Sequence, residues 1–165
     1  MSSYDRRTVL KAGALAIGGL AVLAGCGFTP AYGPSGGAGA LRNSVQVAEP
    51  DTSAQFALVT RLEQRLGQPE AVAYTLDFSL NVDSDGVGIT STQTTSRFNL
   101  IGTAQYALTD ATSGASVDTG VVRGVVGYSN TGTTIATDAA RDDAYERLMV
   151  ILADQIVARL IAATP

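Results

Sequence analysis

The pattern of hydrophobic and polar residues predicts three β-strands between residues 72 and 128. Between residues 72 and 82, apolar side chains occupy every second position and the positions between them are mostly polar. The same period of two recurs from Arg97 to Thr109 and, with more valine and glycine, over 116–128. Because successive side chains of a strand point to opposite faces, we expect three half-buried strands here.

Turn-forming residues separate these strands. Asp83 to Gly86 predicts a turn after the first strand, and 110–114, which ends in glycine, predicts a turn between the second and third. The Thr- and Ser-rich stretch 88–96 is either an extended continuation or a long loop. Three glycines in the third strand indicate bulging or a close backbone approach. They are Gly120, Gly124 and Gly127.

Two other segments have helical spacing. Over 52–66, apolar residues recur at steps of three and four, and Thr52 with Gln55 has the spacing of a capping box. The predicted apolar positions are Phe56, Val59, Leu62 and Leu66. From about Ile135 a wide apolar stripe predicts a long second helix. Val45 and Val47 predict a brief strand before the first helix.

The element order is therefore β-α-β-β-β-α. Two helices can cover one face of a four-stranded sheet, so we expect an α+β fold, a two-layer sandwich. The other sheet face would carry polar side chains and be exposed or used for binding. Its predicted members include Asp77, Ser79, Thr103 and Gln105.

The first 25 residues are predicted to be a lipoprotein signal peptide. A basic start is followed by a 13-residue uncharged stretch, Ala12 to Ala24, which is short for a membrane-spanning helix. Leu23 to Cys26 matches the bacterial lipobox, so Cys26 is the predicted lipid attachment site. Asp5 to Lys11 resembles a twin-arginine export signal; an ordinary Sec signal with two adjacent arginines is the alternative. Gly27 after the cysteine favours the outer membrane.

Removal of the signal peptide leaves an acidic chain. The 165 residues carry 11 Lys+Arg and 15 Asp+Glu, of which three basic residues and one acidic residue precede Cys26, so the mature charge is 8 − 14 = −6. We expect a lipidated flexible tether over 26–40, rich in Gly and Pro, and one domain over 41–165. The acyl chains would bind the membrane, and nucleic acid is not an expected partner.

Candidate chemistry is sparse. Without His and with a single Cys, the chain has no His-based triad, zinc cluster or internal disulfide. A Ca²⁺ site at Asp83 and Asp85 is conceivable, but the remaining ligands of an EF-hand are missing, and a hairpin turn is the simpler interpretation. We therefore expect no catalytic residues, no metal and no cofactor.

The mature chain resembles the LptE family of lipopolysaccharide-assembly lipoproteins, in its alphaproteobacterial form. The resemblance covers essentially the whole mature chain, in order and with similar spacing. It rests on Cys26–Gly33, Arg97–Leu100, Tyr106–Asp110, Gly127–Ser129, Asp143–Leu148 and Leu152–Ile156.

This resemblance implies a function. Members of the family plug the outer-membrane β-barrel LptD and help it insert lipopolysaccharide into the outer leaflet, so LptD and lipopolysaccharide are the implied partners. The implied location is the outer membrane, lipid-anchored and facing the periplasm and barrel lumen. Arg97 and Arg123 are the candidate lipopolysaccharide contacts; otherwise they are solvated strand residues or partners of Asp77 and Asp118.

Two other functions are compatible with the sequence. One is an auxiliary lipoprotein of an envelope ABC lipid transporter, which would also be a tethered α+β domain. The other is a periplasmic enzyme, suggested by the twin-arginine signal alone.

Overall fold

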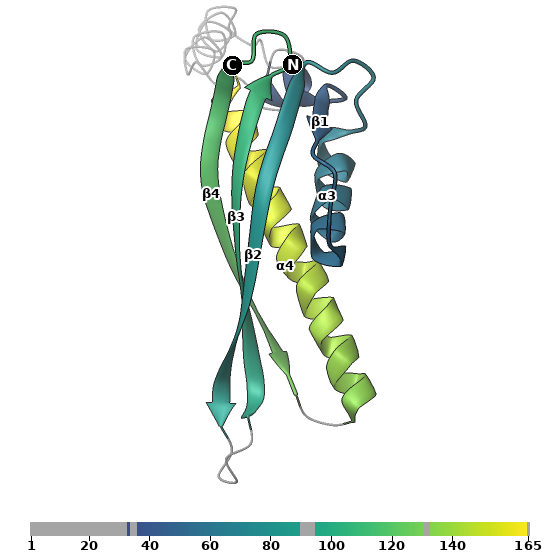
Figure 1. The fold of residues 1–165 in the computed structure, drawn as a ribbon, viewed down its shortest axis with the longest axis vertical. Coiled ribbons are helices and arrows are strands. Elements are labelled where there is room, and N and C mark those ends of the chain that lie inside the picture. Colours follow the sequence, from purple (N-terminus) through teal and green to yellow (C-terminus); the bar gives the residue numbers. More distant parts are fainter. Residues whose placement is uncertain (1–32, 34–35, 90–94, 131–132, 165) are drawn as a thin grey trace, which may run out of the picture. The chain divides into compact units, whose positions relative to one another are not determined.

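The computed structural model describes residue 33 and residues 36–89, 95–130 and 133–164. Cys26, the predicted signal peptide and most of the predicted tether lie outside these residues. The described elements are three helices and four strands (Figure 1). They are α2 (Gly37–Leu41), β1 (Val45–Val47), α3 (Ser53–Leu66), β2 (Tyr74–Ile89), β3 (Thr95–Asp110), β4 (Ser116–Ser129) and α4 (Thr134–Ala163).

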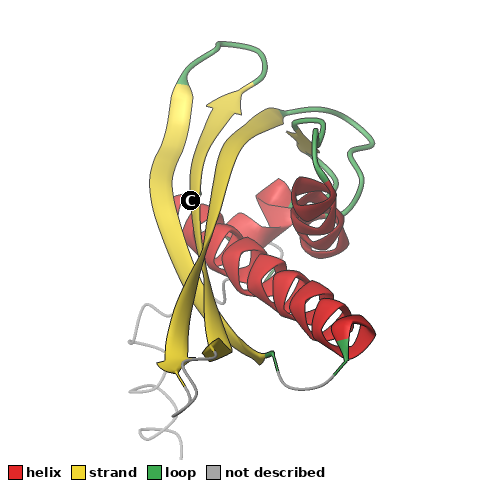
Figure 2. Ribbon diagram, turned by 60° about the horizontal axis from the view of Figure 1, so that its bottom comes forward, coloured by secondary structure: helices red, strands yellow, loops and turns green. Residues whose placement is uncertain are grey.

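The four strands form one mixed sheet in the order β1-β2-β3-β4. β1 runs parallel to β2, while β2, β3 and β4 are antiparallel to one another. Both long helices lie on the same side of the sheet (Figure 2). The predicted fold class and the order β-α-β-β-β-α are confirmed, with α2 added before β1.

Helix α2 occupies the last part of the segment interpreted as a tether. Gly37 and Leu41 are buried. A β-carbon on Gly37 would collide with the backbone carbonyl oxygens of Ile161 and Thr164, so this glycine allows α2 to lie against the end of α4. Packing of the described chain therefore begins before residue 41.

The core lies between the helices and one sheet face. Even-numbered residues of β3 and β4 point inward, and Leu100, Leu108 and Val122 are buried. They meet α4, whose inner face contributes the largest set of buried side chains. This set is Ala144, Leu148, Met149, Leu152, Ala153, Ile156, Val157 and Leu160.

Helix α3 begins where predicted, and three of its four predicted apolar positions, Val59, Leu62 and Leu66, are buried. The Thr52 hydroxyl accepts from the Gln55 amide at 3.2 Å, while the Gln55 side chain accepts from the Asp51 amide, one residue before the position that a capping box uses. Phe56 is 65% exposed, and Leu58 is buried instead. The apolar positions fit two overlapping stripes, and packing of α3 against α4 selects the one that includes Leu58.

The predicted turn at Asp83–Gly86 is wrong. β2 continues through it to Ile89, with Asp83 opposite Ile101 and Asp85 opposite Asn99. Pairing with β3 satisfies the backbone groups of these turn-prone residues, and the glycines instead mark register shifts after Gly86.

The second predicted turn is confirmed: the Asp110 carboxylate accepts from the Thr112 and Ser113 amides. The Ser113 backbone and hydroxyl bonds lower the pKa of Asp110.

A pair of glycines allows α4 to pack closely against the sheet. Gly102 and Gly124 lie opposite each other on β3 and β4, on the inward face. A β-carbon at Gly102 would lie 2.9 Å from Leu152 Cδ1, and one at Gly124 would lie 3.0 Å from Leu148 Cδ1. The glycine at 124 therefore reflects close approach, as predicted, and Gly102 takes part in the same contact.

We predict that Gly102→Val lowers the free energy of unfolding by about 1–3 kcal/mol, because the added methyl groups overpack the contact with Leu148 and Leu152. Urea denaturation measures the change. Gly127→Val is the matched control on the opposite face, where the atom nearest to an added β-carbon is the side-chain Oδ1 of Asn99 at 3.3 Å. Equal effects of the two substitutions would contradict a helix seat at Gly102.

Candidate functional site

The open face of the sheet carries the side chains that sequence reasoning selected for binding. Asp77, Ser79 and Gln105 are exposed and Thr103 is half-buried. The face is not uniformly polar. Asp77, Asp83 and Asp85 belong to β2, whereas β4 presents exposed Val121 and Val125.

The two candidate arginines share this face but are not neighbours. Arg97 lies opposite Ser129, near the start of β3, and Arg123 lies opposite Thr103. Thr103 is six positions along β3 from Arg97, which corresponds to about 20 Å. The structure therefore places the two guanidinium groups at separate points along the face.

Neither arginine pairs with the acid considered for it. Within the described residues, no ion pair joins Arg97 to Asp77 or Arg123 to Asp118. The Nε of Arg123 donates a long hydrogen bond, 3.4 Å, to the Thr103 hydroxyl. Both arginines are exposed. This arrangement leaves their charge available to a ligand or to solvent.

Asp118 has a different partner. The Tyr106 hydroxyl donates to Asp118 Oδ2 at 2.9 Å, and the Tyr106 ring lies over Gly120, its cross-strand neighbour. Burial raises the pKa of Tyr106, and the adjacent Asp118 carboxylate raises it further. The hydrogen bond links the end of β3 to the start of β4. We interpret the Tyr106–Asp118 pair as structural.

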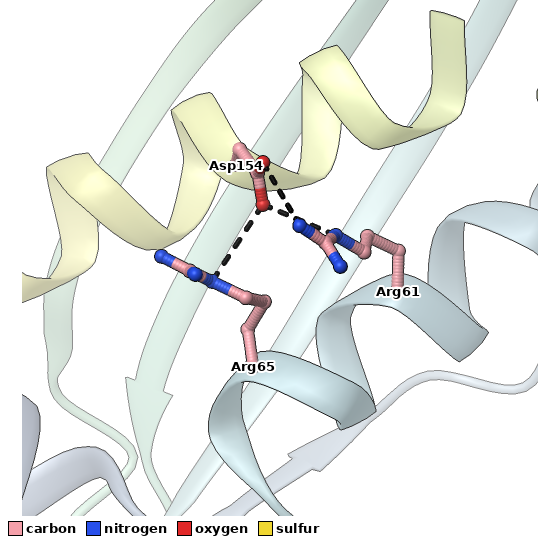
Figure 3. Close-up of polar contacts among 3 residues, drawn as sticks. All are labelled: Arg61, Arg65 and Asp154. Carbon is pink, nitrogen blue, oxygen red and sulfur yellow. Dashed lines mark hydrogen bonds and ion pairs between the residues drawn. The ribbon is translucent and has the colours of Figure 1, made fainter. Parts of the chain in front are cut away.

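An ion-pair cluster that the sequence analysis did not select joins the two long helices. Asp154 of α4 accepts two bonds from Arg61, from Nε at 3.2 Å and from Nη2 at 3.1 Å (Figure 3). Arg65 Nε lies 3.6 Å from Asp154 Oδ1, the oxygen that also accepts from Arg61 Nε. The signal in the sequence that could have indicated this cluster is the spacing of Arg61 and Arg65, which lie four residues apart on one helix face. The acid that they share is 93 positions away from Arg61 along the chain.

The described part of the chain forms neither a metal-binding cluster nor a membrane-spanning helix. Within it, no group of three or more His, Cys, Asp or Glu side chains could hold a metal ion. Asp83 and Asp85 are strand residues here. None of the described helices combines the length and the apolar character that crossing a membrane requires. Cys26, the predicted lipid attachment site, lies outside the described residues.

Solved structures with this arrangement come from bacterial lipoproteins. A protein of Caulobacter crescentus, provisionally described as a lipoprotein, is 25% identical with a TM-score of 0.64, covering 76% of this chain and 93% of that chain. The rare lipoprotein B of Shewanella oneidensis is 13% identical with a TM-score of 0.56, covering 72% and 92%. An uncharacterised lipoprotein B of Nitrosomonas europaea is also 13% identical with a TM-score of 0.56, covering 72% and 82%. The fold is thus that of a class of bacterial lipoprotein domains.

Within that class, the chain belongs to the LptE lipopolysaccharide-assembly family, whose model matches residues 42–160. The match includes all four strands, α3 and most of α4. A comparison with curated proteins finds no match. The predicted resemblance is confirmed, and it places the chain among envelope lipoproteins with a general role in lipopolysaccharide assembly.

We predict that Asp154→Ala lowers the free energy of unfolding by about 1 kcal/mol, because it removes a two-bond contact and leaves Arg61 and Arg65 without their shared carboxylate. A thermal or urea denaturation cycle with Arg61→Ala isolates the coupling. Arg147→Ala is the control, since it removes only an exposed i,i+4 pair with Asp143 and should cost about 0.3–0.5 kcal/mol. A coupling energy of zero would show that the cluster does not hold the helices together.

Proposed function

We propose that this protein is an outer-membrane lipoprotein that plugs an LptD-type β-barrel and assists it in inserting lipopolysaccharide into the outer leaflet. The observation that carries this proposal is the family match over residues 42–160. The fold is consistent with it, because the sheet has one face packed on helices and one face open.

A plug needs a surface compatible with a water-lined lumen. The open sheet face meets that need over β2, where exposed Asp77, Ser79, Asn81, Asp83 and Asp85 alternate along the strand. Helix surfaces add further exposed charge, including Arg141, Asp142 and Asp143. A domain covered in this way can be surrounded by water and by the polar interior of a barrel without burying large apolar patches.

Membrane attachment in this proposal comes from lipid on Cys26 rather than from the domain surface. The mature chain has a net charge of −6, which does not favour an anionic membrane. Each buried methylene contributes about 0.8 kcal/mol, so several acyl chains would hold the protein at the membrane. The anchor would then keep the domain on the periplasmic side, where the barrel lumen opens.

Lipopolysaccharide contact is proposed for Arg97 and Arg123. Among the described residues, they are the two arginines on the open sheet face, and both are exposed. Guanidinium groups bind phosphate through paired N–H donors, so each could take an anionic group of the glycolipid. Their separation of about 20 Å along the sheet means that one phosphate cannot bridge them, and two separate groups would be needed.

The barrel partner can be tested by affinity purification from detergent-solubilised outer membranes. We expect the wild-type protein to recover a large β-barrel in this fraction. Cys26→Ser should shift the protein out of the membrane fraction because the predicted acylation site is lost, while the folded surface stays the same. Recovery of an inner-membrane transporter complex, or of no barrel, would contradict the proposed role.

The glycolipid contact has its own test. The double variant Arg97→Ala, Arg123→Ala should bind purified lipopolysaccharide about tenfold more weakly, as expected if each lost ionic contact is worth about 0.7 kcal/mol. Arg141→Ala, Arg147→Ala removes the same charge from exposed pairs on α4 and serves as the control. Equal affinity of the two double variants would remove Arg97 and Arg123 from the site.

A further inference from the structure

No strand of the described residues pairs with the outer edge of β4. β4 is the last strand in the sheet order, has β3 on one side, and has no strand of the described chain on the other (Figure 1). A strand in this position presents a row of backbone N–H and C=O groups to its surroundings. These groups can pair with another extended backbone.

One side chain identifies which carbonyls point outward. Gln155 of α4 donates from Nε2 to the Arg123 carbonyl oxygen at 3.1 Å, so this carbonyl is directed away from β3. In an antiparallel ladder the direction alternates, so Val121 and Val125 share the orientation of Arg123. Among the hydrogen bonds of the described residues, only the Arg123 carbonyl of these three accepts from a side chain.

The edge lacks two of the features that usually prevent strand addition, although it carries the exposed charge of Arg123. β4 reads SVDTGVVRGVVGYS and contains neither Pro nor Lys. Val121 and Val125 are 52% and 54% exposed on the open face, beside the outward backbone groups. A strand pairing here would gain hydrogen bonds and cover these two apolar side chains at the same time.

The side chains of the same three residues define what such a strand would carry. Along the open face of β4 they run apolar, cationic, apolar: Val121, Arg123 and Val125. Arg123 makes no ion pair with another described residue. An added strand would match this surface with a carboxylate opposite Arg123 and apolar side chains on either side of it.

We propose that the outer edge of β4 binds an extended segment of a partner protein as a fifth strand of the sheet, with an acidic side chain facing Arg123 between apolar side chains facing Val121 and Val125. Gln155 occupies the central carbonyl in the free protein and is displaced when the strand pairs. This inference goes beyond the role in lipopolysaccharide assembly and requires neither the barrel nor the glycolipid; the added strand and the glycolipid contact proposed above would compete for Arg123.

The test uses the purified lipidated protein in detergent and a dye-labelled peptide, Thr-Val-Thr-Glu-Thr-Val-Thr. We expect saturable binding by fluorescence anisotropy. A peptide with Lys in place of Glu should bind about tenfold more weakly, and Arg123→Glu should reverse this preference. Arg147→Glu changes the net charge equally but lies on α4, so it should leave the preference unchanged.

A backbone-modified peptide separates strand pairing from simple adhesion. Methylation of the peptide nitrogens that face β4 removes donors and should abolish binding, although the side chains are unchanged. Equal binding of the methylated peptide would overturn the proposal, as would no saturation up to about 1 mM peptide. A homodimer formed through β4 without peptide, seen by analytical ultracentrifugation, would assign the edge to a second copy and would also overturn it. These outcomes are independent of barrel recovery.

Discussion

The close approach of α4 to the sheet is the contact on which the rest of the domain depends. It exists because two facing positions, Gly102 and Gly124, have no side chain, so Leu148 and Leu152 can reach the backbone of β3 and β4. The helix and strands thereby share one core, and α3 packs on the helix already seated there. Asp154, held two residues after Leu152 on the same helix, then meets Arg61 and Arg65 of α3. The hydrophobic layer and the ion-pair cluster thus both depend on the absence of side chains at Gly102 and Gly124.

Most of the fold could be predicted from the sequence because its elements are long and regular. Alternation over 72–82 and 97–109 identifies strands whatever the partner, and the Thr52 hydroxyl marks the start of α3 locally. The errors arise where tertiary contacts overrule local signals. Asp83–Gly86 has turn composition, yet pairing with β3 keeps it extended. Phe56 fits an apolar stripe, yet the face of α3 that meets α4 excludes it.

The candidate site shows the same difference between local signals, which the sequence reveals, and tertiary contacts, which it does not. Placement of Arg97 and Arg123 on the open face follows from strand parity and could be read from the sequence. Their separation along β3 could not, because it depends on the register of β4 against β3. The ion-pair cluster at Asp154 could not be predicted either, because its partners lie in another helix far along the chain. Cys26 is predicted as the lipid attachment site from a linear motif, which needs no tertiary information. A short motif can thus be recognised from the sequence alone, whereas the distances between side chains on a surface depend on the fold.

The continuation of β2 past Asp83 has a consequence for the motions of the domain. It carries the β2–β3 pairing into a region where few side chains are buried: residues 83–87 are exposed, and so is most of α4 before Ala144. There the stacked rings of Phe98 and Tyr128, both half-buried, supply much of the apolar contact. The free energy needed to open the backbone locally therefore decreases from Leu108 toward Gly88. Amide protons along one hairpin would report a gradient of protection, with the end nearest the β2–β3 connection exchanging first and the end beside the β3–β4 turn anchored by the core.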